Sequence, residues 1–305
     1  MQDFTDRFNR IYSRSMEEAL FLEPWQGHYL SRKIEMEILA HKFDFKSDYI
    51  GLEIGCGNAF QSILLASLTS RIFATDLCNK DCHTHSLGIS KAKALIDKLN
   101  IKNVTLVSCS GDRLPFSDSY FDFVFSSSTL EHVDDKNLAL KEIKRVLKPG
   151  GCFITIVPTH MPSLYAFMHV YLYCLARIFK VFFKSGNKLG SYTERLEQLS
   201  LWVKFKKNHP SFPMPEPHGS YRNIFHELFS QLPLNWENIF RKSDFKIKYS
   251  FGMLFFPWLL IEPFSTMACA RIYSLTKNIN IKLSFFALLK YISYLECVIA
   301  VKDNQ

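Results

Sequence analysis

Short apolar runs alternate with longer amphipathic segments through the first half of the chain. The runs that indicate β-strands are 50–54, 71–75, 104–108, 121–125 and 153–157. The run at 121–125 is almost wholly apolar, as is typical of a strand buried on both faces of a parallel sheet. Between the last two runs, the apolar residues of 137–147 fall on one face of a predicted helix, which Pro149, Gly150 and Gly151 are expected to end. This alternation predicts an α/β fold with a ligand crevice at the carboxyl ends of the strands.

The remaining segments predict additions around that sheet. Residues 4–45 indicate helix, while 245–251 and 296–302 indicate two late strands with a helical stretch over 283–294 between them. We expect a Rossmann-like, doubly wound, mostly parallel sheet with a late antiparallel strand and with helical N-terminal and C-terminal additions. The expected parts are a helical extension (1–47), a ligand-binding core (48–160), a helical lid or substrate insertion (161–243) and the final strands and helix of the sheet (244–305).

Residues 164–184 are apolar enough to suggest a membrane span at first. Their polar positions indicate otherwise, because residues spaced three or four apart form one stripe along a helix. The stripe consists of His169, Tyr173, Arg177, Lys180 and Lys184. Such an amphipathic helix can pack on the core, form a lid or lie in a membrane interface, so peripheral membrane contact is one expectation.

Composition and charge narrow the class of protein. Hydrophobic residues make up 48% of the 305 residues, which excludes a disordered or collagen-like chain. The net charge of +8 belongs to the second half, since residues 1–162 hold 19 Lys and Arg against 20 Asp and Glu. A basic surface suits nucleic acid, anionic lipid or acidic substrates, and it is also compatible with a solvated face. The polar N-terminus lacks a secretory signal, so we expect a reduced, cytoplasmic chain, with the inner membrane surface as a further location.

One cluster of cysteine and histidine residues is a candidate metal site. Cys78, Cys82, His83 and His85 supply four potential metal ligands within eight residues. Their order and separation match no zinc-finger spacing, and we therefore expect no metal site there.

The residues with candidate chemical roles lie at or near the turn after the first strand. Gly55 and Gly57 allow a close approach of backbone to ligand, and Asp76 follows at the end of the second strand. A carboxylate at that position can accept hydrogen bonds from both hydroxyls of a ribose, as any nucleoside cofactor requires. The third glycine of the dinucleotide fingerprint is missing, however, and Glu53 precedes the turn. A carboxylate there suits a cofactor with a positive amino-acid end better than a pyrophosphate.

The chain resembles the class I S-adenosylmethionine-dependent methyltransferases, in the broad group called methyltransferase type 11, over about residues 48–160. The motifs that carry the resemblance are the segments 52–57 (LEIGCG), 114–118 (LPFSD), 121–124 (FDFV), 127–133 (SSTLEHV) and 145–151 (RVLKPGG), together with Asp76. The resemblance implies an enzyme that uses S-adenosyl-L-methionine.

The resemblance also implies roles for individual positions. The methionine end of the cofactor would lie against Glu53, Gly55, Cys56 and Gly57. The ribose hydroxyls would bind Asp76, the adenine would contact Leu77 and the segment with Ser110, Gly111 and Asp112, and Ser127 would border the sulfonium. Two positions depart from the family pattern: Ala59 replaces a common glycine, and Ser110 stands where an acid usually receives the adenine amino group.

Methyl transfer requires alignment of the acceptor, exclusion of water and, for a hydroxyl acceptor, a general base. His132 and His160 follow the fourth and fifth strands and are the candidate bases, although we favour a structural role for His132, in which its imidazole holds its own turn in place. The aromatic, basic second half favours a small hydrophobic acceptor or a lipid or saccharide type of acceptor. A non-catalytic binding protein and an RNA methyltransferase are the alternatives; nucleic acid is the less favoured partner, and the sequence does not predict the oligomeric state.

Overall fold

The structure is a computed structural model of the 305-residue chain. It describes residues 10–15, 26–77, 88–165, 220–255 and 278–303, and the single positions 17, 18, 167, 168, 171, 175 and 217.

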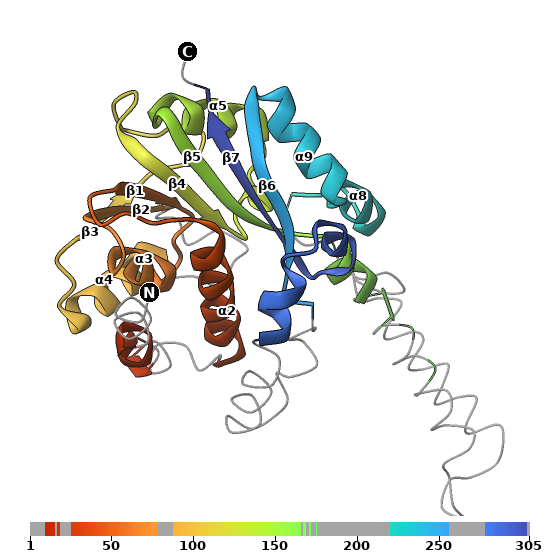
Figure 1. The fold of residues 1–305 in the computed structure, drawn as a ribbon, viewed down its shortest axis with the longest axis horizontal. Helices are drawn as coiled ribbons and strands as arrows, with labels where there is room; N and C mark the ends of the chain where they lie inside the picture. The colour runs from red at the N-terminus through yellow and green to blue at the C-terminus, as the bar shows by residue number, and fades with distance from the viewer. Residues whose placement is uncertain are drawn as a thin grey trace, which may run out of the picture.

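Seven strands form one sheet in the order β3-β2-β1-β4-β5-β7-β6. Their bounds are β1 Ile50–Ile54, β2 Arg71–Asp76, β3 Val104–Ser108, β4 Phe121–Ser127, β5 Leu147–Pro158, β6 Phe245–Met253 and β7 Leu295–Lys302. Neighbouring strands among β1 to β5 pair in parallel, and β7 runs antiparallel to both β5 and β6 (Figure 1). This topology confirms the predicted Rossmann-like fold class.

Helices cover both faces of the sheet (Figure 1). One face carries α2 Gln26–Lys42, α3 Phe60–Ala66 and α4 Gly88–Leu99, and the other carries α5 Lys136–Val146 and α9 Pro233–Lys242. The shorter α8 Ile224–Ser230 precedes α9, η1 Leu130–His132 follows β4, and η3 Ala287–Ile292 precedes β7. The predicted helical stretch over 283–294 is therefore mostly a 3₁₀ helix.

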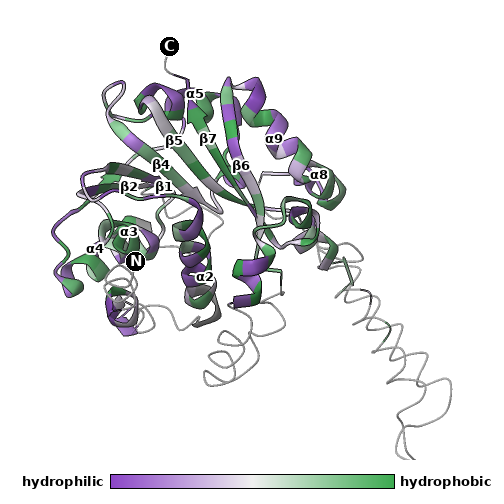
Figure 2. Cartoon of the chain, in the orientation of Figure 1, coloured by the Kyte–Doolittle hydropathy of each residue, from purple (hydrophilic) through white to green (hydrophobic). Residues whose placement is uncertain are grey.

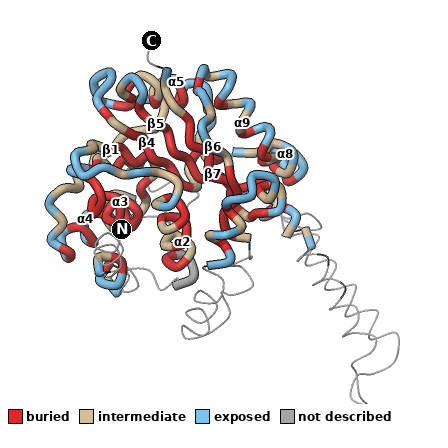
Figure 3. The backbone as a smooth tube through the Cα atoms, viewed as in Figure 1, coloured by how far each residue is buried: buried red, intermediate tan, exposed pale blue. Residues whose placement is uncertain are grey.

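Each face of the sheet packs its own apolar layer. In β4, Phe123 and Phe125 belong to the layer beneath α2, α3 and α4, while Val124 belongs to the layer beneath α5 and α9. All three side chains are fully buried, which explains the unbroken apolar run in this strand. Figures 2 and 3 show the same result, with apolar, buried strands between helices that turn their polar sides outward.

The end of α5 differs from the prediction. The helix stops at Val146, and residues 147–151 already belong to β5 rather than to the end of the helix. Phe121 pairs with Leu147, whereas Phe123 pairs with Cys152, so β5 bulges at this point. Gly150 has a φ of 73°, which lets the backbone make this irregular turn within the strand.

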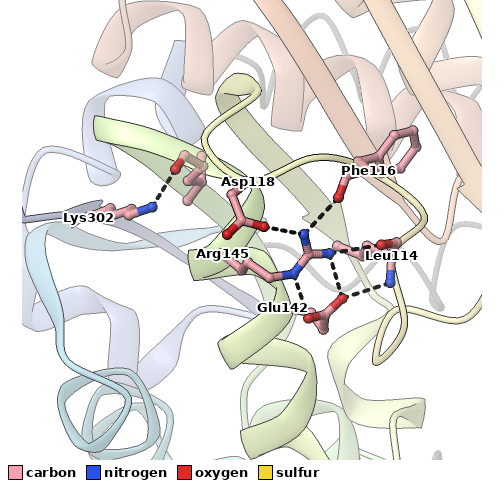
Figure 4. A network of polar contacts seen from close by, with 7 residues as sticks. Leu114, Phe116, Asp118, Glu142, Arg145 and Lys302 are labelled. Atoms are coloured by element: carbon pink, nitrogen blue, oxygen red, sulfur yellow. Dashed lines mark hydrogen bonds and ion pairs between the residues drawn. The ribbon is translucent and has the colours of Figure 1, made fainter.

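Arg145 fastens the loop between β3 and β4 to α5 (Figure 4). Its guanidinium donates to both carboxylate oxygens of Glu142, to Asp118 at 2.7 Å, and to the carbonyls of Phe116 at 2.7 Å and Leu114 at 2.9 Å. The hydrogen bonds from Arg145 hold the pKa of the Glu142 carboxyl below its ordinary value. The loop is thereby fixed where it follows the carboxyl end of β3.

Little of the amphipathic segment 164–184 is described. Residues 161–165, 167, 168, 171 and 175 are helical, and the polar stripe from His169 to Lys184 lies outside the described residues. Within the described part of the chain, no helix combines the length and apolarity needed to cross a bilayer.

Candidate active site

The glycine turn after β1 is tied to the end of β2. The amides of Gly55 and Cys56 donate to the carbonyl of Thr75 at 2.8 and 2.9 Å. The amide of Gly57 donates to the Asp76 carboxylate at 2.6 Å. Backbone donors and a carboxylate from two neighbouring strands therefore meet at the carboxyl edge of the sheet, as the sequence predicts.

The two glycines have different surroundings. Gly55 has a φ of +74°, and a methyl group on it would lie 2.8 Å from Thr129 Cβ. Gly57 has a φ of +53°, and a methyl group on it would meet nothing within 4 Å. Ala59 also has a positive φ, 61°, at the residue before α3, which shows why the family often places glycine there. Gly57 thus borders open space, whereas Gly55 is packed against protein.

Asp76 faces the glycine turn. Its carboxylate accepts from the amides of Gly57 and Leu77, at 2.6 and 2.7 Å. Partial burial raises the pKa of this carboxyl, and the two amide hydrogen bonds act against the rise. Leu77 is 42% exposed, so an apolar surface is available beside the carboxylate.

Glu53 lies beneath the turn and is 2% exposed. The hydroxyl of Ser62 donates to it. Burial raises the pKa of the Glu53 carboxyl to about 8, and the nearby Asp76 adds to the rise, while Ser62 and the Arg32 guanidinium oppose it. Glu53 therefore holds a proton near neutral pH until a cation approaches it.

A hollow of about 440 Å³ opens next to Asp76. Its lining consists of Ser108, Cys109, Ser110, Asp112, Arg113 and Pro115. The amide of Cys109 donates to the carbonyl of Asp76 at 3.2 Å, and Gly111 approaches Ile54 so closely that a methyl group would lie 3.1 Å from its Cγ2. The volume falls in the range of small-molecule pockets. The open space at Gly57, the carboxylate at the end of β2 and the adjoining hollow together fit a nucleoside cofactor.

Helix α2 contributes side chains that the sequence analysis missed. Asn58, in the glycine turn, donates to the Tyr29 hydroxyl at 2.9 Å, and Gln61 donates to Glu35 at 3.1 Å. Arg32 donates to Glu35 at 2.9 Å and to the hydroxyl of Ser127. Tyr29, Arg32 and Glu35 follow one another at intervals of three, so polar groups sharing one face of an otherwise apolar helix were the available signal.

The two predicted histidines lie after neighbouring strands. His132 ends η1, where its carbonyl accepts from the Ser220 hydroxyl at 3.1 Å. His160 follows β5, and burial lowers its pKa, so its imidazole is neutral near neutral pH. The Nδ1 atom of His160 is buried without a hydrogen-bond partner among the described residues.

The cysteine and histidine cluster at Cys78, Cys82, His83 and His85 lies outside the described residues. Over the parts of the chain that the structure covers, no group of three or more His, Cys, Asp and Glu side chains is arranged to hold a metal ion.

Comparison with known proteins places the chain in a family. Residues 52–155 match a family described as "Methyltransferase domain". A demethylmenaquinone methyltransferase of Bacillus cereus (strain AH187) is 32% identical over 170 residues, which are 56% of this chain and 67% of the relative.

Solved structures share the fold. One is a complex of the Haloferax volcanii Trm112 methyltransferase activator with a methyltransferase, with a TM-score of 0.51, 14% identity, and coverage of 98% of this chain and 97% of the other. Another is the 4+2 cyclase SpnF, with a TM-score of 0.51, 13% identity, and coverage of 92% and 83%. The family match, the relative and the fold agree with the site geometry, and the chain belongs to the class I S-adenosylmethionine-dependent methyltransferases.

Proposed function

We propose that the chain transfers a methyl group from S-adenosylmethionine to a small lipophilic acceptor that carries an ionisable hydroxyl, such as a prenylated quinol. The observation behind this proposal is an aromatic rim beside the carboxyl end of β5, which we define as Phe167, Tyr171, Phe225 and Phe229. The ring of Phe167 lies 5.5 Å from Phe225 and 6.3 Å from Tyr171, between centroids. Tyr171, Phe225 and Phe229 are 46%, 50% and 62% exposed. Exposed aromatic side chains that gather at one edge of a site favour an apolar ligand.

The Bacillus relative supports the same acceptor class. Its name describes methylation of demethylmenaquinone. The match covers 56% of this chain and 67% of the relative at 32% identity, so the acceptor of this chain is our proposal. The same rim also suits a lipid-linked saccharide, which the experiment below separates from a quinol.

The residues of the site divide into cofactor contacts and acceptor contacts. We assign Glu53 and Gly57 to the methionine end of the cofactor, Asp76 to the ribose, and the hollow with Asp112 to the adenine. Ser127, held by Arg32, borders the reacting end. Bound S-adenosylmethionine supplies a methyl group on a positively charged sulfur, which is a strong electrophile.

The protein's task is to align the acceptor and keep water out. Orientation of two reactants can lower a barrier by about 7–11 kcal/mol, which makes positioning the largest contribution that these residues offer. We assign the part of segment 161–243 that precedes α8 the role of lid over the acceptor, because α9 packs on the sheet itself. His160, neutral and close to the end of β5, and His132 are the two histidines that the sequence predicts as bases in this part of the fold.

Cofactor binding is expected to release about one proton near neutral pH, because the ammonium of the cofactor lowers the raised pKa of Glu53. In the free protein the Glu53 carboxyl has a pKa of about 8 and is therefore mostly protonated at neutral pH. A neighbouring cation favours the ionised carboxylate. Calorimetric titration with S-adenosylhomocysteine in two buffers with different ionisation enthalpies measures this release. The Glu53→Gln variant is the control and should show no buffer dependence. Equal binding enthalpies for the native chain in both buffers would contradict the assignment.

The proposed function is tested by incubating the protein with methyl-labelled S-adenosylmethionine and three acceptors. These are a prenylated quinol without its ring methyl, a polyprenyl-linked saccharide and total RNA. We expect label to enter the quinol. Label in the saccharide alone would keep a lipophilic acceptor and reject the quinol, whereas label in RNA alone, or in none of the three, would overturn the proposal.

A further inference from the structure

Buried polar atoms without hydrogen-bond partners gather at one pole of the described fold. Five of them belong to Ser126, Glu131, Thr155, His160 and Ser163. All of these residues lie in β4, in β5 or in the segments that directly follow the two strands. Because buried polar groups in proteins are normally paired, an unpaired set indicates a place where a polar ligand is received.

Glu131 is the acidic member of this set. It lies in η1, directly after β4, and is 1% exposed. Its Oε2 atom has no hydrogen-bond partner among the described residues. The amide of Ser220 donates to its carbonyl at 3.1 Å, so the segment leading into α8 covers η1. A carboxylate oxygen in such a position is costly unless it accepts a proton or a hydrogen bond.

Charged groups from several elements surround the Glu131 carboxyl. Arg32 of α2 and Lys136 of α5 favour its ionised form, and Glu227 of α8 opposes it. Tyr221 lies just before α8. Burial raises the pKa of its phenol, and the negative charges of Glu131 and Glu227 raise it further. The Glu131 carboxyl therefore interacts electrostatically with two cations and with a second buried acid.

Arg32 links Glu131 to the reacting end of the cofactor site. Its guanidinium donates to Ser127, the last residue of β4, and, at 3.5 Å, to Ser128, which follows the strand. The same guanidinium acts electrostatically on Glu53 beneath the glycine turn. Glu131 thus lies on the side of the site where an acceptor would meet the methyl group.

We propose that Glu131 is a catalytic residue that accepts the proton of the acceptor's hydroxyl during methyl transfer. The inference rests on the proposed function. As the bond between the methyl carbon and sulfur breaks, its electron pair stays on the sulfur, which becomes a neutral thioether. The acceptor forms the new bond to the methyl carbon, and its proton passes to Oε2 of Glu131 to give the carboxylic acid.

The protonation of Glu131 is suited to this role. Burial raises its pKa to about 7 and Glu227 adds to the rise, while a hydrogen bond from its own backbone amide, Arg32 and Lys136 oppose it. A base works best when its pKa lies near the working pH, and a positioned base typically contributes about 100- to 10,000-fold. Since only the carboxylate can accept a proton, the rate falls as the pH drops below this value.

The Glu131→Gln variant tests the role, with methyl transfer to the acceptor found in the labelling experiment. We expect kcat to fall about 100- to 10,000-fold and the acid limb of the pH profile to disappear. Affinity for S-adenosylhomocysteine should change little, which shows that the variant is folded. Glu131→Asp should recover part of the rate. A native rate and pH profile in Glu131→Gln would overturn the inference while leaving the proposed function in place.

Two neighbouring variants test the same inference without removing the carboxyl. Glu227→Gln removes a negative charge and should move the acid limb to lower pH, whereas Lys136→Gln removes a positive charge and should move it to higher pH. A base remote from both charges would give limbs that do not shift in opposite directions, and that result would overturn the inference even if Glu131→Gln failed to fold. A native chain that methylates no acceptor would overturn the proposed function, and this assignment with it.

Discussion

The Asp76→Asn variant is expected to bind S-adenosylhomocysteine about 100-fold more weakly than the native chain. The native carboxylate can accept from both ribose hydroxyls, and a hydrogen bond to a charged group contributes about 1.5–3 kcal/mol. Loss of about 3 kcal/mol corresponds to a 100-fold change in Kd. Asparagine keeps the size of the side chain and still accepts from the Gly57 amide, so the turn should stay intact. Calorimetric titration measures the affinity.

A matched control separates the local effect from the change in net charge. Asp97 is exposed near the end of α4, and Asp97→Asn makes the same chemical change there. The control should bind the ligand like the native chain. Equal affinity of Asp76→Asn and Asp97→Asn would remove Asp76 from the cofactor site.

Alanine at the two turn glycines is expected to produce opposite defects. Gly57→Ala adds a methyl group to open space, so it should cost only about 1 kcal/mol of unfolding free energy, from its positive φ. That space is the one we assign to the cofactor, and affinity should therefore drop at least about 100-fold. Gly55→Ala drives a methyl group into Thr129 and should cost about 2–4 kcal/mol.

Chemical denaturation of both variants measures the change in unfolding free energy, and ligand titration measures the change in cofactor affinity. Thr129→Ala in the Gly55→Ala background is the matched control, because it removes the group with which the added methyl collides and should restore part of the stability. Full cofactor affinity in Gly57→Ala would show that the open edge of the turn is not the binding surface.

The parallel core could be predicted from the sequence because each strand has a local signature. β1 and β3 begin and end where their apolar runs do, and the burial of Phe123, Val124 and Phe125 follows from the unbroken run in β4. The limits of β5 could not be predicted in the same way. Its first residues are fixed by pairing of Leu147 with Phe121 across the sheet, a long-range contact that brings Pro149 and Gly150 into the strand although these residue types favour a turn.

The candidate site likewise combines features that the sequence predicts with features that it does not. The glycine turn and Asp76 are close in space because parallel strands end at one edge, and that rule works from sequence alone. Arg32 joins the site through the packing of α2, which no local pattern specifies. The burial of Glu131 depends equally on Ser220, which lies 89 positions further along the chain and packs against η1. Predictions from spacing therefore reach the cofactor pocket but miss the groups brought by tertiary contacts.

A crystal structure of the protein with S-adenosylhomocysteine tests the cofactor site most directly. We expect the ribose hydroxyls on the Asp76 carboxylate, the amino-acid end beside Glu53 and Gly57, and the adenine in the hollow that Ser108, Cys109, Ser110, Asp112, Arg113 and Pro115 line. A ligand bound elsewhere, with Asp76 still held only by the amides of Gly57 and Leu77, would contradict it.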